Sequence, residues 1–248
     1  MKRPPDDHFS SIAQAYARGR ISYPPQLFAH LASLCPGHDL AWDCATGSGQ
    51  AAVALAATFA RVEATDLSAE LLRQAPAHPR IRYRVAHAEN SGLADRSVDL
   101  LTVAQALHWF EHSLFEREVL RVLRPRGILA CWGYVWPAVN PVVDALLEQF
   151  KAQIAPHWPP RAALLQAGYS TLRFSLPELP APQFRIAVRW TAADYLAHLA
   201  SWSAVRYHRE KTGSDIVEEF RPGFERVWGG SPIEVRWDLV LRIFRKPD

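Results

Sequence analysis

Between residues 40 and 134, short apolar runs alternate with longer segments whose apolar residues have helical spacing. Short apolar runs predict strands over residues 40–45, 61–66, 81–86, 98–105 and 128–133. The fourth run is almost continuously apolar, which is typical of a strand buried on both faces. Helices are predicted between these runs, over residues 48–59, 68–74 (with Ser68 as N-cap) and 114–123. Strands that alternate with helices through short loops predict right-handed βαβ crossovers and a parallel sheet.

The pattern becomes less regular on both sides of this region. After Pro137 we expect helices over residues 142–154, 192–207 and 215–228. Residues 168–176 and 184–190 have strand character, and residues 233–245 are expected to form one long terminal strand of the sheet. Before the first strand, helices are predicted over residues 9–17 and 26–33. We therefore expect one integrated domain with a helical N-terminal cap (1–38), an alternating strand–helix core (39–136) and later additions that include the final strands (137–248).

Composition and charge narrow the possible partners. The chain has 248 residues, of which 49% are hydrophobic and 21% charged, as in an ordinary globular protein. Its formal net charge of +3 is too small to favour nucleic acid or an anionic membrane as a partner. Three scattered cysteines without CxxC spacing predict neither a metal site nor a disulfide framework. The N-terminal residues lack an apolar signal core, and we expect a cytoplasmic protein.

The stretch "WDCATGSGQ", residues 42–50, is the first candidate for chemistry. Gly47 and Gly49 lie where the first predicted strand turns into a helix, so the backbone there can adopt unusual dihedral angles and approach a ligand closely. Asp66 ends the next strand, near the spacing at which a nucleotide-binding fold places an acid for the ribose. A dinucleotide site is one interpretation of these features.

Asp43 favours a different ligand. It ends the first strand and should lie near the crevice, where its carboxylate would repel a pyrophosphate. A ligand with an ammonium group would instead be attracted. S-adenosyl-L-methionine (SAM) carries an amino acid end, a sulfonium and a ribose but no phosphate. Asp43 would then attract the ammonium directly or through water, and Asp66 would accept both ribose hydroxyls.

Four stretches together resemble the ordered motifs of class I SAM-dependent methyltransferases, of the broad type 11 group. They are "WDCATGSGQAAVALA", "VEATDLSAELL", "VAHAENSGLADRSVDLLTVAQALHWF" and "LRVLRPRGILACWGY". "AQALHWF", "YARGRISYP" and "YLAHLASWSAVRYHR" more narrowly resemble trans-aconitate methyltransferase-like proteins. The resemblance implies an α/β fold that is Rossmann-like and doubly wound. It further implies a mostly parallel seven-stranded sheet, with helical N-terminal and C-terminal additions forming a substrate lid.

The resemblance also implies roles for individual residues. The methionine part of SAM would lie along the glycine loop, the adenine near Leu67 and Glu89, and the sulfonium above Gln105. Two departures are visible, since Ala45 replaces the first glycine of the usual motif and His87 replaces an acid. The implied cofactor-binding residues are Tyr16, Arg20, Asp43, Ala45, Thr46, Gly47, Gly49, Asp66, Leu67, Ala88, Glu89, Gln105 and Ala106.

Candidates for the acceptor side come from two regions. His108 and Trp109 follow the fourth strand, where His108 is either a general base or a structural hydrogen-bonding residue, and Trp109 either walls the site or fills the core. Trp202 and Arg206 have helical i, i+4 spacing, with Arg209 beyond them, so one face would present an aromatic ring and cations suited to an anionic acceptor. The alternative is a solvated basic face. Further candidates are Trp136, His157, Trp158 and Tyr207.

Three functions follow from these candidates. The first is SAM-dependent methyl transfer to a small molecule, with a carboxylic acid as the favoured acceptor and S-adenosylhomocysteine (SAH) as product. The second is a SAM-using enzyme with other sulfonium chemistry, such as a cyclase or lyase that releases methylthioadenosine. The third is a nicotinamide-dependent oxidoreductase, which Asp43 disfavours. No basic stripe or N-P-P-Y-type motif suggests nucleic acid, and the sequence does not indicate an oligomeric state.

Overall fold

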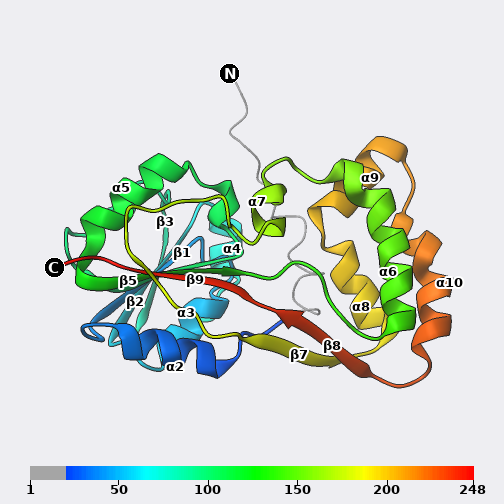
Figure 1. Cartoon of the computed structure of the whole chain (residues 1–248), viewed down its shortest axis with the longest axis horizontal. Helices are drawn as coiled ribbons and strands as arrows, with labels where there is room; N and C mark the ends of the chain where they lie inside the picture. Colours follow the sequence, from blue (N-terminus) through cyan, green and yellow to red (C-terminus); the bar gives the residue numbers. More distant parts are fainter. Residues whose placement is uncertain (1–20) are drawn as a thin grey trace.

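The structure is a computed structural model that describes residues 21–248. A twisted sheet with helices on both faces forms one half of the molecule, and a group of helices carried on a two-stranded arm forms the other (Figure 1). The predicted helix 9–17 and the candidate residues Tyr16 and Arg20 lie outside the described residues. Their predicted roles therefore stay predictions.

The central sheet has seven strands in the order β3-β2-β1-β4-β5-β9-β6. The first five strands in this order are parallel, and β9 is antiparallel to both β5 and β6. The expected mostly parallel, Rossmann-like sheet is thereby confirmed. The strands are β1 (Leu40–Cys44), β2 (Arg61–Asp66), β3 (Ile81–Val85), β4 (Val98–Ala104), β5 (Leu123–Gly133), β6 (Glu178–Leu179) and β9 (Val240–Arg245).

Helices cover both faces of the sheet. On one side lie α2 (Pro25–Leu34) and α3 (Gln50–Leu55), and on the other α5 (His112–Val122) (Figure 1). Six of the seven residues of β4 are buried, as its apolar run predicts. The short helix α4 (Ala69–Arg73) begins after Ser68, whose hydroxyl accepts a 3.2 Å hydrogen bond from Leu71 N, so the expected N-cap is confirmed. These crossovers place all carboxyl ends of the parallel strands at one edge of the sheet.

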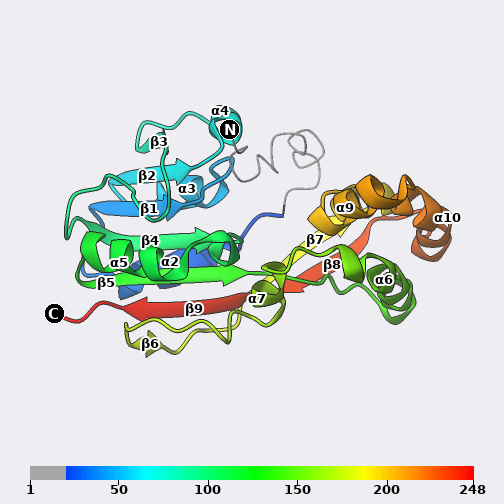
Figure 2. The ribbon, with the colours of Figure 1, turned by 90° about the horizontal axis from the view of Figure 1, so that it is seen from above.

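The second half is built from α6 (Pro141–Ile154), α8 (Ala192–Ala200), α9 (Ser203–Thr212) and α10 (Ile216–Trp228). It is joined to the sheet by an antiparallel arm of β7 (Arg185–Trp190) and β8 (Ile233–Asp238), which Figure 2 shows extending away from the sheet. One apolar cluster runs continuously from Leu31 under the sheet to Phe224 on α10. The three-part division proposed from the sequence stays a prediction.

Three predictions of secondary structure are wrong. The helix expected over 192–207 is broken at Trp202, whose extended backbone (φ −71°, ψ 135°) ends one helix and begins another. Residues 168–176 form no strand, because Gly168 and Tyr169 adopt left-handed φ angles of 62° and 56°. The terminal strand expected over 233–245 is divided at Leu239, whose N–H donates to Phe184 O, so β8 pairs with β7 and only β9 joins the sheet.

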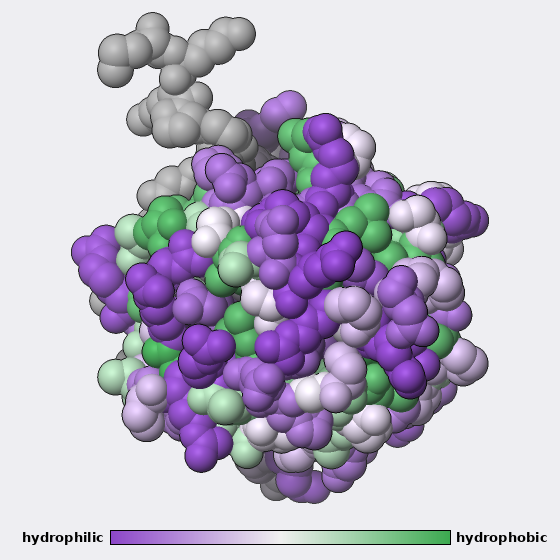
Figure 3. Space-filling model, turned by 90° about the vertical axis from the view of Figure 1, so that its left-hand side faces the viewer, coloured by the Kyte–Doolittle hydropathy of each residue, from purple (hydrophilic) through white to green (hydrophobic). Residues whose placement is uncertain are grey.

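The face that points away from the helical half is mostly hydrophilic (Figure 3). Within residues 21–248, no helix combines the length and the apolar character needed to cross a bilayer. In the same part of the chain, no cluster of three or more histidine, cysteine or acidic residues is arranged to hold a metal ion. The cofactor-binding candidates that follow β1, β2 and β4 lie at the carboxyl edge of the sheet.

Candidate active site

The glycine loop after β1 has an unusual backbone. Ala45, Gly47 and Gly49 all adopt left-handed φ angles, of 55°, 58° and 82°. A side chain at Gly49 would meet Tyr83 Oη at 2.6 Å, so this position requires glycine for space as well as for conformation. Ala45 tolerates the left-handed conformation where the family pattern has its first glycine. The loop therefore presents bare backbone at the carboxyl end of β1, as a closely approaching ligand requires.

Asp66 is held in place at the end of β2 by two backbone groups. Its Oδ2 accepts a hydrogen bond from Gly47 N and its Oδ1 accepts one from Ser68 N, both at 2.8 Å. Partial burial raises the pKa of this carboxyl group above its ordinary value. Each carboxylate oxygen retains acceptor capacity after one hydrogen bond. Asp66 thus has the free lone pairs that two ribose hydroxyls need, and it also fixes the glycine loop.

Asp43 lies beneath the loop and is almost completely buried, with 1% exposure. Its Oδ1 accepts a 2.7 Å hydrogen bond from Thr102 Oγ1, and its Oδ2 accepts one from Thr46 Oγ1. Burial raises the pKa of Asp43 to about 6. Its charge therefore acts from below the loop, and a direct contact with a ligand would require rearrangement of the two threonines.

The predicted adenine side is formed by residues after β2 and β3. Leu67 is 60% exposed directly beside Asp66, which leaves an apolar side chain free to cover a flat ring. Ala88 is buried, and Glu89 Oε1 accepts a 2.9 Å hydrogen bond from Glu111 N. The Glu89 side chain thus ties the loop after β3 to the start of α5. These positions are compatible with the predicted adenine contacts.

Gln105 and Ala106 follow β4 at the same edge. Gln105 has a left-handed φ of 58°, and its amide Nε2 donates to Tyr134 O at 3.1 Å. The Gln105 side chain is therefore turned toward Tyr134. The predicted place of Gln105 beneath the sulfonium stays a prediction.

His108 is buried, with 6% exposure, in the short helix η1 (Leu107–Trp109). Its Nδ1 lies 3.2 Å from Tyr169 Oη, and burial, aided by the nearby Arg161, lowers the pKa of His108 to about 4. The imidazole is therefore neutral at pH 7. This geometry matches the structural alternative for His108 better than that of a general base. Trp109 is half-buried beside it, and its carbonyl oxygen accepts a 2.7 Å hydrogen bond from Arg161.

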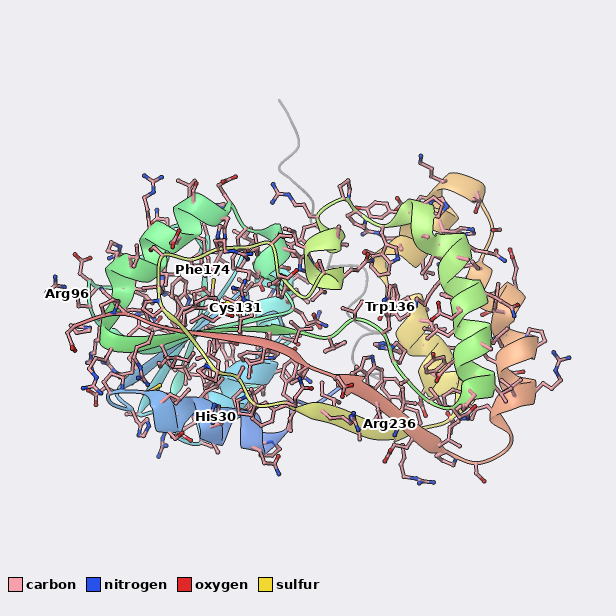
Figure 4. All side chains as sticks on the ribbon, in the orientation of Figure 1. His30, Arg96, Cys131, Trp136, Phe174 and Arg236 are labelled. Carbon is pink, nitrogen blue, oxygen red and sulfur yellow. The ribbon has the colours of Figure 1, made fainter. Side chains whose placement is uncertain are left out.

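Three tryptophans from separate segments converge beside this edge. Trp136 follows β5, Trp158 follows the short helix η2 (Ala155–His157), and Trp202 precedes α9. Their ring centroids lie 5.4 Å (136–202), 5.8 Å (136–158) and 6.0 Å (158–202) apart. Figure 4 shows Trp136 between the sheet and the helical half. We call Trp136, Trp158 and Trp202 the tryptophan cluster.

Cations accompany the aromatic rings. Lys151 Nζ lies 4.2 Å from the centroid of the Trp136 ring, and the Arg206 guanidinium lies 4.8 Å from that of Tyr207. Arg209 instead forms an ion pair with Asp215 at 2.5 Å. Cations therefore accompany aromatic rings here, but the role predicted for Trp202, Arg206 and Arg209 on one helix face stays a prediction. His157 contacts His208 on α9, with ring centroids 5.0 Å apart.

Several residues of this region carried no recognisable signal in the sequence. Tyr169 lies in a segment that was predicted as a strand, and Arg161 precedes the unpredicted helix α7 (Ala162–Gln166). Lys151 lies on α6 and reaches Trp136 only through folding. Thr102 is one apolar-flanked residue of a buried strand. Thr102 lies beside Asp43 only because β1 and β4 are neighbours in the sheet.

The chain is similar to known methyltransferases. Residues 42–131 match the family profile described as methyltransferase domain. A solved structure from Anaeromyxobacter dehalogenans, assigned as a type II methyltransferase, is 41% identical. It has a TM-score of 0.86, and the match covers 92% of this chain and 99% of that one. A protein of Dictyostelium discoideum assigned as a methyltransferase is 30% identical over 221 residues, 87% of this chain and 84% of its own length.

These similarities decide between the cofactors considered above. A methyltransferase takes its methyl group from SAM, and the free lone pairs of Asp66, the bare glycine loop and exposed Leu67 fit a ribose, an amino acid chain and an adenine. The nicotinamide-dependent alternative is therefore wrong. The relatives do not test the narrower resemblance to trans-aconitate methyltransferase-like proteins, which stays a prediction. The chain belongs to the SAM-dependent methyltransferases.

Proposed function

We propose that this enzyme transfers the methyl group of SAM to a small organic acid held between the glycine-loop edge and the tryptophan cluster. The observation that carries the proposal is the convergence of Trp136, Trp158 and Trp202 from three separate segments. Aromatic side chains that meet beside a cofactor edge are typical of an apolar small-molecule site. A macromolecular acceptor would instead favour an extended charged surface.

The charges around these rings favour an anionic acceptor. A cationic acceptor would seek the open face of an aromatic ring. Here Lys151 already lies over Trp136, and Arg206 over Tyr207. Both cations are largely buried, whereas their acidic partners Glu148 (2.8 Å) and Glu210 (3.7 Å) are exposed. Such pairs contribute little stability, so a carboxylate can replace the acidic partner at little cost.

A carboxylate acceptor also fits the lowered pKa of His108, about 4, which makes its neutral imidazole a weak base. SAM supplies an already activated methyl group for in-line displacement by the acceptor oxygen. A carboxylate is deprotonated at pH 7, so no general base has to remove a proton. The chain's own contribution is then orientation and exclusion of water, and orientation alone can lower a barrier by roughly 7–11 kcal/mol. In this proposal Trp109 and the tryptophan cluster hold the acceptor body, and Arg206 orients its carboxylate.

The test is product analysis with a panel of acids. The enzyme is incubated with SAM carrying a labelled methyl group and small carboxylic acids that differ in size and aromatic content. We expect SAH and a labelled methyl ester, with higher turnover for acids that have an apolar body. Methylthioadenosine from SAM alone would instead establish the cyclase or lyase chemistry. If the enzyme methylated only cationic or neutral acceptors, the proposal of a carboxylic acid as acceptor would be refuted.

Two variants make this test specific. Arg206→Gln should raise the KM for the acid about tenfold, because one charge-assisted hydrogen bond is lost. Arg226→Gln, at an exposed position on α10, is the matched control and should leave the KM unchanged. Equal effects of the two changes would contradict the role of Arg206.

A further inference from the structure

The parallel ladder between β4 and β5 continues beyond the ends of both strands. The last register pair is Ala104 with Trp132, and the next N–H, that of Gln105, donates to Trp132 O at 2.8 Å. Gln105 then turns into the left-handed region, with φ 58°. This conformation is unfavourable for a residue with a long side chain, and glycine or asparagine would adopt it more readily. The backbone alone therefore does not explain glutamine at this position.

The side chain of Gln105 supplies the explanation. Its Nε2 donates to Tyr134 O at 3.1 Å, and its Oε1 accepts from Tyr134 N at 3.3 Å. The side-chain amide thus imitates a peptide group and adds one more step to the ladder. Methionine would have the same length but would make neither hydrogen bond, and glutamate would accept one bond but repel the carbonyl oxygen.

The neighbouring glycine leaves the space that this contact needs. A Cβ at Gly133 would lie 2.7 Å from Gln105 Oε1 and 2.5 Å from Leu165 Cδ1 on α7. Both distances are far shorter than ordinary van der Waals contacts. Gly133 has no left-handed φ, so the close approach of neighbouring atoms, rather than its conformation, requires glycine here.

The segment that begins at Tyr134 leads to the tryptophan cluster. Its far end is held where Ala138 and Arg236 exchange two backbone hydrogen bonds, of 2.8 and 2.9 Å. Trp136 lies between these two attachments and packs against Trp202. One attachment is therefore an ordinary bridge to β8, and the other includes the Gln105 side chain together with packing of Tyr134 against Trp237, whose ring centroid lies 6.0 Å away.

We infer that Gln105 is a positioning residue for the methyl acceptor. Its side chain fixes Tyr134 and thereby sets where Trp136 lies relative to the edge that holds the cofactor. The inference rests on the proposed function, in which Trp136 lines the acceptor site. Gln105 then has two separate tasks. Its backbone follows β4 at the carboxyl edge of the sheet, and its side-chain amide helps to align the acceptor.

The test compares cofactor binding with acceptor kinetics in three variants. Gln105→Met removes both hydrogen bonds and keeps the length, Gln105→Gly also relieves the left-handed backbone, and Gln166→Met on α7 is an exposed control. For the two Gln105 variants we expect an SAH Kd within about threefold of wild type by calorimetry. Amide hydrogen exchange at Tyr134 should become about five- to tenfold faster. The KM for the acid should rise about tenfold while the KM for SAM stays within about twofold.

Each other outcome has a defined meaning. A fall in SAH affinity that matches the rise in acceptor KM would overturn the inference, because Gln105 would then be a cofactor ligand. A Gln105→Gly variant with wild-type kinetics would also overturn it, since backbone conformation and not the amide would matter. If wild type methylates no acid, the proposed function fails on its own. Unchanged exchange at Tyr134 would then overturn the inference independently, and faster exchange with intact SAH affinity would support it.

Discussion

Replacing Asp43 by asparagine tests the charge beneath the glycine loop without changing its shape. The carboxylate is buried and accepts hydrogen bonds from Thr46 and Thr102. An asparagine amide can accept one of these bonds and donate in the other direction. The Thr102 hydroxyl is able to accept from it, because Trp42 O lies within 3.5 Å as an alternative acceptor for the hydroxyl proton. We therefore expect Asp43→Asn to fold.

The magnitude follows from the pKa of Asp43. Burial raises this pKa from 3.8 to about 6 in the folded protein. The folded state then binds the proton more tightly than the unfolded chain, so this contribution to stability is complete below pH 3.8 and is lost as pH rises through about 6. At 1.36 kcal/mol per pKa unit, the ionised carboxylate costs about 3 kcal/mol at pH 7. Asparagine does not ionise and avoids this cost.

The assay is urea unfolding of wild type and Asp43→Asn between pH 4.5 and 7.5. The variant should gain roughly 2 kcal/mol relative to wild type across this range. The difference between the two proteins is the useful quantity, because His108 and His198, whose pKa values burial lowers to about 4 and about 3, add the opposite slope to both. A stability difference that does not change with pH would refute the raised pKa of Asp43.

Cofactor affinity supplies the second half of this prediction. SAH carries the ammonium that Asp43 is predicted to attract, and opposite charges several ångströms apart in a partly buried site attract by about 1–4 kcal/mol. We expect Asp43→Asn to weaken SAH binding about tenfold or more in calorimetry. The matched control is Asp95→Asn, at a side chain that is 74% exposed and paired with Arg121. Equal losses in both variants would remove the argument from charge.

Three further predictions concern other parts of the site and its support. Asp66→Ala should weaken SAH binding about a hundredfold or more, because two charge-assisted hydrogen bonds to the ribose are lost; an unchanged calorimetric Kd would refute the ribose assignment. Gly133→Ala should lower the free energy of unfolding by about 1–3 kcal/mol, and Leu165→Ala in the same chain should restore part of it; additive losses would contradict the predicted clash. Asp99→Ala should cost about 3–5 kcal/mol in urea unfolding, because Arg124 and two backbone N–H groups lose a completely buried partner; a loss below about 1 kcal/mol would show that water replaces the carboxylate.

The sheet was the most predictable part of the fold. The predicted strand 61–66 has the observed bounds, and strands 40–45, 81–86 and 98–105 are each one residue too long. Apolar runs of this kind report burial within a single segment, which depends on local sequence alone. Ser68 was likewise predictable as an N-cap, because the cap and its N–H partner lie three residues apart.

Boundaries that depend on distant contacts were not predictable. The helical spacing of apolar residues continues through Trp202, with Leu199 before it and Val205 after it. In the structure the indole packs against Trp136, 66 positions earlier in the chain, and the backbone of Trp202 is extended. The terminal segment alternates early and is then mostly apolar, so its sequence predicts one long strand. Its division at Leu239 arises because β8 and β9 find partners in two different sheets.

The candidate site divides along the same line. The glycine loop, Asp43 and Asp66 could be recognised from the sequence because they lie at strand ends with characteristic spacing. The second hydroxyl partner of Asp43 could not, since Thr102 lies 59 residues from Asp43. His108, which the sequence left as either a general base or a structural residue, shows the difference most clearly. His108 follows β4 as a catalytic histidine would, but folding places Tyr169 against it.

The sequence by itself predicted the alternation of strands and helices, the glycine turn and the two strand-end acids that are candidates for the cofactor site, because each of these depends on residues close together in the chain. Only the tertiary structure decided the burial of Asp43, the use of the Gln105 amide and the meeting of the three tryptophans. These features join segments far apart in the sequence, and their geometry depends on how the helical half packs against the sheet. The residues predicted to bind the cofactor therefore lie in short local segments of the chain. The surroundings of the proposed acceptor site depend instead on packing between distant segments.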